Sequence, residues 1–169
     1  MKRQKPVPLP QQYSADVVRS DGDSGRVFVD GMTRRTEANV GGMSNIVISR
    51  PDKRCLYTIL PNLNGYMKSP LTEEMLSAMH CEDVGEAWEF VGEETLDGTT
   101  VRRFNAFLPG QSRPYEVVYV QPATGIRVRT VTLNRNGDEV LTVETRNVVM
   151  GPPPKEMFEI PEGMKEIRR

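Results

Sequence analysis

Turn-forming residues recur at short intervals along most of this chain. Residues 21–25 combine Asp, Gly and Ser, Asp97 precedes Gly98, and residues 134–137 contain Asn and Gly. These residue types tolerate the positive φ angles that tight turns require. The runs between them are rich in β-branched and aromatic residues and span about 6–10 positions, the length of ordinary strands. This spacing predicts an antiparallel, mostly β fold and not alternating strands and helices.

Composition limits the protein to a single globular domain of modest size. The chain has 169 residues, of which 37% are hydrophobic and 27% charged. A chain of this length can build one buried core. Its net charge of -1 offers no electrostatic attraction to nucleic acid or to an anionic membrane. No apolar run approaches the roughly 20 residues needed to span a bilayer. We therefore expect residues 12–169 to form one β domain.

The first residues have a different character. Residues 1–5 are basic, as at the start of a signal peptide, but Pro6, Pro8 and Pro10 follow in place of an apolar segment. Three closely spaced prolines favour an extended and poorly ordered lead-in over residues 1–11. Either the protein is cytosolic, or this is a mature chain from which a signal peptide has been removed.

Only residues 71–80 show a helical pattern. Glu73 and Glu74 fall in the first turn, where negative charge complements the helix dipole. Apolar side chains recur at helical spacing and form a stripe along one face. The stripe comprises Leu71, Met75, Leu76 and Met79. Such a helix must cover another apolar surface, and the concave face of a strongly curved sheet is a natural one.

Several segments of the chain resemble the LolA-type superfamily of outer-membrane lipoprotein-sorting and carrier proteins. The resemblance extends over nearly all of the chain from Tyr13 onward and rests on patterns of strands and turns. The matching segments are residues 25–30, 32–37, 46–48, 56–61 with Tyr66, 92–98 and 153–163. The chain departs from the carrier itself in lacking a helix before its first strand and in having one lid helix instead of several.

The resemblance implies a fold and a function. The fold is a strongly curved antiparallel sheet, an unclosed half-barrel, with a helical lid on its concave face and an apolar cavity between them. Proteins of this superfamily shelter acyl chains in the bacterial envelope, in lipoprotein sorting and outer-membrane biogenesis. Relatives of the same fold include mycobacterial lipid-binding lipoproteins and a sensor of envelope stress. A periplasmic or envelope location follows from the same resemblance.

Two functional hypotheses result. The first is a non-catalytic envelope protein that binds a lipid, a lipoprotein acyl chain or another apolar ligand between sheet and helix. The alternative is a protein-interaction or stress-sensing module of the same fold without a lipid cavity. The candidate cavity and lid residues are Leu71, Met75, Leu76, Met79, Met67, Trp88, Phe104 and Tyr57. Methionine suits a cavity for variable apolar ligands, but it also fills irregular cores, and both interpretations stay open.

The remaining reactive side chains do not predict catalysis or a cofactor. Cys55 and Cys81 could form a disulfide that ties a strand to the end of the helix, or could stay reduced, and both alternatives remain open. Thioether, imidazole and thiolate groups at Met75, Met79, His80 and Cys81 suit Cu(I), but adjacent helical side chains point apart, so we predict no metal site. With His80 as the single histidine and no Gly-x-Ser-x-Gly motif, we expect no enzyme.

Overall fold

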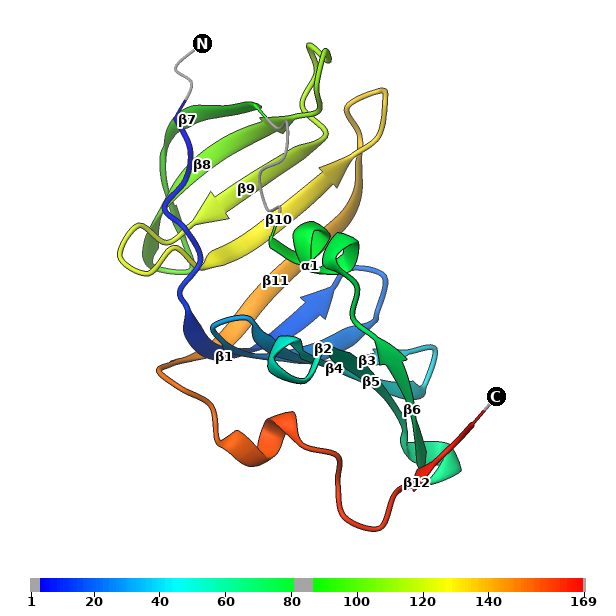
Figure 1. The fold of residues 1–169 in the computed structure, drawn as a ribbon. Coiled ribbons are helices and arrows are strands. Elements are labelled where there is room, and N and C mark those ends of the chain that lie inside the picture. The colour runs from blue at the N-terminus through cyan, green and yellow to red at the C-terminus, as the bar shows by residue number, and fades with distance from the viewer. Residues whose placement is uncertain (1–3, 81–86, 169) are drawn as a thin grey trace. The chain divides into compact units, whose positions relative to one another are not determined.

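The structure is a computed structural model that describes residues 4–80 and 87–168, with residues 77–80 described by their backbone alone. Within these residues the chain is mostly β, as predicted (Figure 1). The strands are β1 (Gln12–Arg19), β2 (Ser24–Asp30), β3 (Thr33–Val40), β4 (Met43–Arg50), β5 (Cys55–Leu60), β6 (Gly65–Pro70), β7 (Ala87–Leu96), β8 (Thr99–Phe107), β9 (Glu116–Val120), β10 (Arg127–Leu133), β11 (Glu139–Met150) and β12 (Lys165–Glu166).

The strands belong to one unclosed sheet. Their hydrogen-bonded order is β12-β6-β5-β4-β3-β2-β1-β11-β10-β9-β8-β7, so β12 and β7 are its end strands. The neighbours pair antiparallel within β2 to β6 and within β7 to β11, whereas the short β12 pairs parallel with β6. Most pairs join strands that are consecutive in the sequence, which is the meander that the turn spacing predicted.

The chain divides into two compact units. Unit 1 comprises residues 1–10, 18–22 and 83–146, and unit 2 comprises residues 11–17, 23–82 and 147–169. Strands β1 and β11 contribute residues to both units. Each unit is described separately below, and the expectation of one domain over residues 12–169 stays a prediction.

Two similar turns shape the hairpins of unit 2. The 3-10 turns η1 (Pro51–Lys53) and η2 (Pro61–Leu63) join β4 to β5 and β5 to β6. Proline suits the first position of such a turn because its φ is already fixed near the required value. Each turn ends at a residue with positive φ, Arg54 at 51° and Asn64 at 47°. The turns reverse the chain within three residues and set the register of the three strands.

The core of unit 2 lies between its sheet and the segment that follows β11. Phe158, at the end of the 3-10 turn η3 (Lys155–Phe158), is buried against Ile48, Tyr57 and Ile59. Phe28 and Cys55 complete this cluster. Ile160, two residues after η3, packs against the same cluster.

The core of unit 1 is aromatic. Trp88 on β7 and Phe104 on β8 meet edge to face with ring centroids 6.4 Å apart. Ala106, Val118 and Val120 from β8 and β9 surround them and are almost completely buried. Edge-to-face aromatic pairs add about 0.5–1.5 kcal/mol to the burial of their apolar area.

The helix α1 (Glu73–His80) begins two residues later than the sequence suggested. Thr72 caps it, since its Oγ1 accepts a hydrogen bond from the N–H of Met75 at 3.2 Å. Leu71 therefore precedes the helix, where it is buried and donates its N–H to the Arg54 carbonyl. Glu73, Glu74 and Met75 are exposed. A helical lid is thus not confirmed.

Candidate functional site

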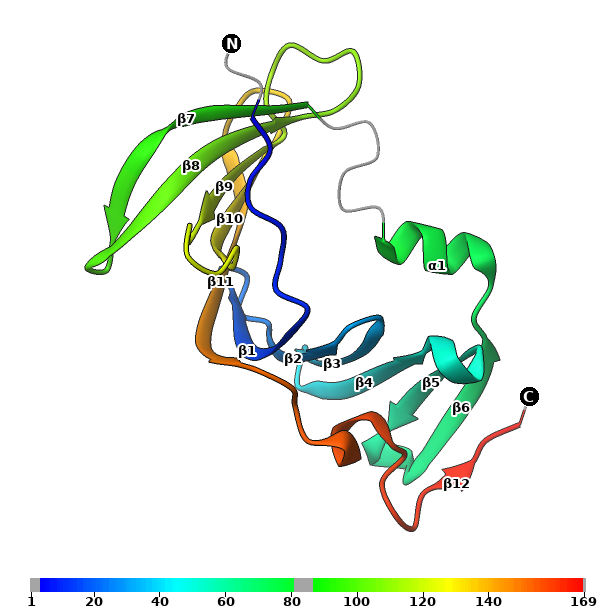
Figure 2. The same ribbon diagram turned by 60° about the vertical axis from the view of Figure 1, so that its left-hand side comes forward.

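The sheet of unit 2 has two faces that differ in how completely they are covered. Alternate residues of a strand point to opposite faces, so the register assigns each side chain to one of them. The η3 face carries Ile48, Tyr57 and Ile59, which pack against Phe158. Figure 2 shows α1 on the other side of this sheet from η3. We call that second side the helix-side face.

Polar contacts hold the C-terminal segment on the η3 face. Arg35 donates to the Met157 carbonyl at 3.2 Å, and Arg50 donates to the Phe158 carbonyl at 3.0 Å. Arg50 also forms an ion pair of 2.6 Å with Glu159. Two main-chain oxygens of η3 and the carboxylate of Glu159 are thus paired with side chains from β3 and β4. This covering is integral to the core.

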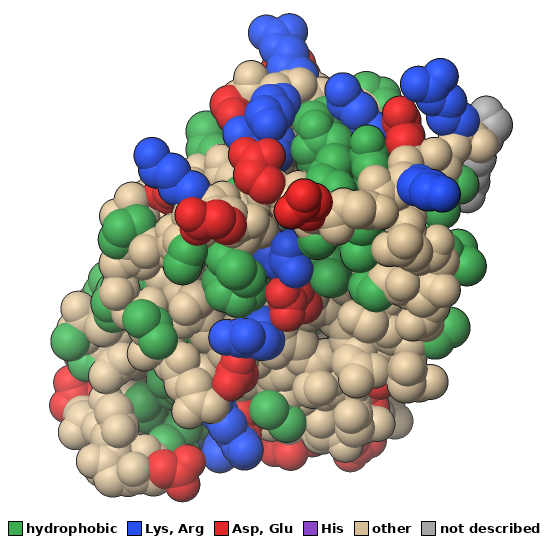
Figure 3. All heavy atoms as spheres, turned by 90° about the horizontal axis from the view of Figure 1, so that it is seen from below, with side chains coloured by type: hydrophobic (Ala, Val, Ile, Leu, Met, Phe, Trp, Pro, Cys, Tyr) green, Lys and Arg blue, Asp and Glu red, His purple; other side chains and the backbone are tan. Residues whose placement is uncertain are grey.

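The same ion pairs shift acid–base equilibria. The pKa of Glu159 lies below its ordinary value because Arg50, and to a lesser extent Lys53, hydrogen-bond to its carboxylate, while partial burial opposes the shift. The hydrogen bond that Arg50 donates to Asp52 raises the pKa of Arg50 further above its normal range. Figure 3 views the molecule from the side on which η3 lies and shows acidic and basic side chains next to one another.

One buried hydroxyl on the η3 face is also perturbed. A side-chain hydrogen bond with Cys55, assisted by burial, raises the pKa of Tyr57 to about 12. Tyr57 therefore stays protonated at any physiological pH and acts as a core residue that also packs edge-on against Tyr66 with centroids 6.0 Å apart.

The helix-side face carries mostly apolar side chains that are half-buried, beside the buried Ser49. Val47 on β4, Thr58 on β5 and Met67 on β6 are cross-strand neighbours on this face. Leu56 and Leu60 flank Thr58 on the same side of β5. All five are half-buried. On the same strand, Cys55, Tyr57 and Ile59 are 2%, 8% and 0% exposed. The two faces of one strand therefore differ in covering, not in hydrophobicity.

The predicted cavity residues do not share one surface. Met67 lies on the helix-side face, whereas Tyr57 lies on the opposite face, within the core under Phe158. Trp88 and Phe104 contact each other, but they belong to the core of unit 1. The structure thus pairs two of the predicted residues and assigns Met67 and Tyr57 to different faces.

The predicted helix residues have mixed surroundings. Leu71 is buried, Leu76 is half-buried, and Met75 is 39% exposed. The side chains of Met79 and His80, and all of Cys81, lie outside the described residues. Cys55 is buried on β5. The Cys55–Cys81 disulfide and the role of Met79 therefore stay predictions.

Sequence reasoning overlooked Val47, Leu56 and Leu60 on the helix-side face. Their signal was present, because residues 55–60 are apolar at nearly every position. A strand with apolar residues on both sides is expected to contact apolar groups on both faces of its sheet. Knowing the hairpin register would have separated Leu56 and Leu60 from Tyr57 and grouped them with Met67.

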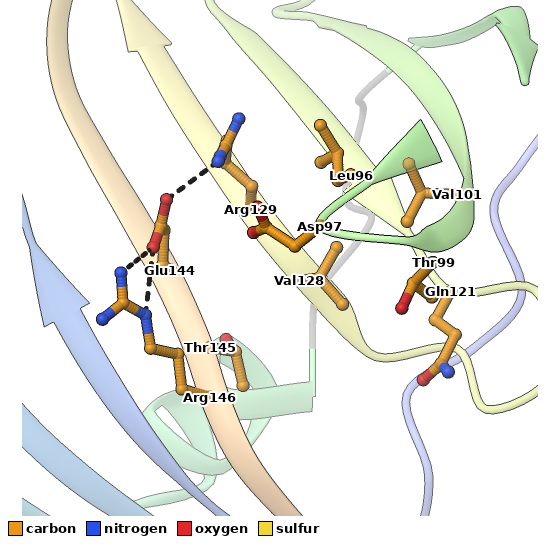
Figure 4. A pocket seen from close by; sticks show the side chains of 10 residues that line it. All are labelled: Leu96, Asp97, Thr99, Val101, Gln121, Val128, Arg129, Glu144, Thr145 and Arg146. Atoms are coloured by element: carbon orange, nitrogen blue, oxygen red, sulfur yellow. Dashed lines mark hydrogen bonds and ion pairs between the residues drawn. The ribbon is translucent and has the colours of Figure 1, made fainter. Parts of the chain in front are cut away.

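Unit 1 contains a polar pocket of about 260 Å³ (Figure 4). Arg129 and Arg146 both bind the carboxylate of Glu144, at 2.9 and 2.5 Å. These contacts, that of Arg146 foremost, hold the pKa of Glu144 below its ordinary value. Leu96 and Val128 supply apolar lining. Both arginines therefore bind one shared carboxylate at the edge of this pocket.

Among the described residues, no group of three or more His, Cys, Asp or Glu side chains is arranged to hold a metal ion. Within the same part of the chain, no helix has the length and apolar character required to cross a membrane.

Comparison of the sequence with known proteins gives no match, either to a protein family profile or to a curated protein. The fold, however, matches solved structures. An uncharacterized conserved protein from Thermus thermophilus has a TM-score of 0.69 at 15% identity, over 95% of this chain and 92% of that one.

Two further solved structures with a similar fold are those of named proteins, MucB and LppX. MucB of Pseudomonas aeruginosa, solved in a complex with MucA, has a TM-score of 0.57 at 13% identity over 90% of this chain. Only 56% of the MucB chain is matched, so the present chain spans little more than half the length of that MucB. Lipoprotein LppX of Mycobacterium tuberculosis has a TM-score of 0.53 at 12% identity, over 82% of this chain and 86% of that one. A mycobacterial lipoprotein is one kind of relative that the sequence resemblance implied, and the chain shares the fold of these solved structures.

Proposed function

We propose that this protein is a non-catalytic envelope protein that binds an apolar ligand, a lipid or a lipoprotein acyl chain, on the helix-side face of unit 2. The observation that carries the proposal is the unequal burial of the two faces of β5. Leu56 and Leu60 are half-buried, whereas Tyr57 and Ile59 between them are buried under Phe158. The likeness to lipoprotein LppX supports the proposal at the level of the fold.

The energetics favour an acyl chain as the occupant. Each methylene group removed from water contributes about 0.8 kcal/mol. A chain that covers Val47, Leu56, Leu60 and Met67 would also remove the exposed parts of these side chains from water. Met67 is flexible and polarizable, so it can adapt to chains of different length and branching.

The helix α1 is proposed as the lid over this ligand. Met75 and Leu76 carry its described apolar surface, and Met79 extends the same stripe by one turn in the sequence. Exposed Met75 gains burial only when an apolar partner covers it. In this proposal the ligand supplies that partner, with α1 on one side and the sheet on the other.

The test combines native mass spectrometry with a binding assay. The protein is purified from cells and examined for co-purified lipid, and it is then titrated with a fluorescent fatty acid. We expect Met67→Asp to weaken fatty-acid binding at least tenfold, because a carboxylate on the helix-side face opposes an acyl chain. Met32→Asp is the matched control, since Met32 lies outside this face, in the turn between β2 and β3, and is 50% exposed.

Circular dichroism must show that both variants remain folded. Met79→Asp should also abolish fatty-acid uptake and leave the sheet intact, and unchanged uptake would mean that α1 is not the lid. If no lipid co-purifies and Met67→Asp binds fatty acid as the wild type does, the proposal fails.

A protein-interaction module is the second candidate function. MucB shares the fold and was solved in a complex with MucA. Affinity purification that recovers one stoichiometric envelope protein, together with the absence of bound lipid, would favour this candidate over the first.

A further inference from the structure

Residues 4–10, which we call the N-terminal strap, lie against the sheet of unit 1. They form no helix or strand and run beside this sheet before the chain enters β1 (Figure 2). Gln4 donates its N–H to the Trp88 carbonyl on β7 at 3.3 Å, and its side-chain Oε1 accepts from Arg102 Nη2 at 3.3 Å. Pro6, two residues later, is buried. The strap therefore has a defined path.

The far end of the strap makes a close backbone contact. Gly125 has a φ of +80°, which favours glycine, and a Cβ placed on it would collide with the carbonyl oxygen of Pro8. Strap and turn can approach this closely only because residue 125 lacks a side chain. The strap is thus in contact with the unit at both Gln4 and Pro8.

The sheet surface at the Gln4 end, which we call the aromatic face, combines aromatic rings with a guanidinium group. Phe90 and Phe104 have ring centroids 5.5 Å apart, and Phe104 also contacts Trp88. The Arg102 guanidinium carbon lies 4.2 Å from the Phe90 centroid and 5.6 Å from that of Phe104. Arg127 lies above the Trp88 ring at 5.9 Å. Guanidinium groups stacked on rings retain their in-plane donors for an acceptor.

The strap leaves donors of this face unused. Trp88 Nε1 and Arg102 Nε are buried and have no hydrogen-bond partner among the described residues. A buried donor without a partner destabilises the folded state, because it has lost its hydrogen bonds to water. Within that same part of the chain, Arg102 is paired with no carboxylate, and the neutral amide of Gln4 is its acceptor. The strap is therefore an imperfect occupant of the aromatic face.

We propose that the aromatic face is a binding site for an extended acidic peptide segment of a partner protein, with which the N-terminal strap competes. The strap shows that an extended, proline-containing backbone fits here and bonds to the main chain of β7 at the end of the sheet. A Glu in place of Gln4 would give Arg102 a charge-assisted hydrogen bond, roughly twice as strong as a neutral one. This site and ligand differ from those of the proposed function, so either proposal can fail alone.

The experiment uses the full-length chain and two labelled peptides. One peptide has the sequence of residues 4–10, and the other has Glu in place of the first Gln. Pro6→Asp displaces the strap by placing a charge where a buried ring lay, without altering the face itself. Pro8→Asp is the matched control, because Pro8 is exposed in the same segment. Fluorescence anisotropy measures binding, and Trp88, the single tryptophan, reports on the face by its emission.

We expect Pro6→Asp to bind the Glu peptide at least tenfold more tightly than the wild type, and Pro8→Asp to bind it as the wild type does. The Glu peptide should bind Pro6→Asp about fivefold more tightly than the Gln peptide, which corresponds to about 1 kcal/mol. Arg102→Gln, combined with Pro6→Asp, should remove this difference. Equal affinity for both peptides, or no peptide binding by Pro6→Asp, would overturn the proposal.

Two further measurements test the proposal independently of the folding of Pro6→Asp and of the peptide assay. Gln4→Glu in the full chain should strengthen the strap, weaken peptide binding and shift Trp88 emission to the blue, even if Pro6→Asp fails to fold. Tighter peptide binding by Gln4→Glu would contradict the competition. If Pro6→Asp binds phosphatidylglycerol vesicles and neither peptide, the face is a lipid site and the peptide proposal is wrong.

Discussion

The C-terminal segment around η3 and the N-terminal strap each cover an apolar sheet face without joining it as a strand. The first buries Phe158 at 4% exposure, pairs two of its carbonyls with Arg35 and Arg50, and adds an ion pair from Arg50 to Glu159. The strap makes two hydrogen bonds of 3.3 Å through Gln4, and two buried donors of the face have no partner in the described part of the chain. Both segments cover a sheet face, but the η3 segment satisfies more of the polar groups beneath it than the strap does.

The difference indicates which coverings can leave. Opening the η3 face would expose a large aromatic side chain and would take the Met157 carbonyl away from Arg35, which is buried. Opening the aromatic face would break the two long hydrogen bonds of Gln4, expose the buried Pro6 and let Trp88 Nε1 find a partner. Segments with few buried apolar contacts open at low free energy, and regions that bind ligands are drawn from them.

Removing the aromatic anchor of η3 should have the largest effect. We expect Phe158→Ala to lower the free energy of unfolding by about 3–5 kcal/mol, through lost burial and the cavity that remains. Guanidinium denaturation measures the change. Leu63→Ala is the control, because Leu63 is 68% exposed and its truncation should change stability by less than about 0.5 kcal/mol. A similar loss in both variants would mean that Phe158 is not the anchor.

Acid should weaken the same covering next. The pKa of Glu159 is lower in the folded than in the unfolded chain, so its stabilising contribution is complete above the ordinary value of 4.5 and is lost as the pH falls through the folded pKa. Glu159→Gln should remove this contribution at neutral pH and reduce the acid dependence of the thermal midpoint. Asp52 and Glu144, whose pKa values are lowered likewise, should preserve part of the dependence. An unaltered pH profile in Glu159→Gln would count against the ion pair.

The smallest of these effects should be the protection of the strap's amides against hydrogen exchange. Hydrogen exchange followed by NMR should show fast exchange at the Gln4 amide and slower exchange at the Met157 amide, which donates to Pro154 at 3.0 Å beside the buried Phe158. The strap is held by two long hydrogen bonds of Gln4 and one buried proline ring, so the free energy of its local opening should lie well below that of the η3 segment. Equal protection at the two amides would remove the distinction between a fixed and a displaceable covering.

Local sequence patterns predicted the strands well, but they did not assign side chains to the faces of the sheet. Asp97-Gly98 and residues 134–137 were expected as turns, and in the structure they connect β7 to β8 and β10 to β11. Tyr57 and Met67 were grouped as cavity residues, although the register assigns them to opposite faces. The facing of a side chain depends on the partner strand, and a one-residue change of register reverses it.

The sequence by itself determined that this protein is mostly β, that its turns fall where Gly, Pro, Asn and Asp allow positive or fixed φ, and that one helix lies near residues 71–80. These properties depend on residues close together in the chain. Tertiary structure alone decided that Phe158 closes one face of β5 and leaves Leu56 and Leu60 half-buried on the other. It also decided that the N-terminal prolines lie against the Trp88 side of unit 1. Residues about 100 positions apart meet only when the sheet has formed, and no local pattern encodes which segment will cover which face.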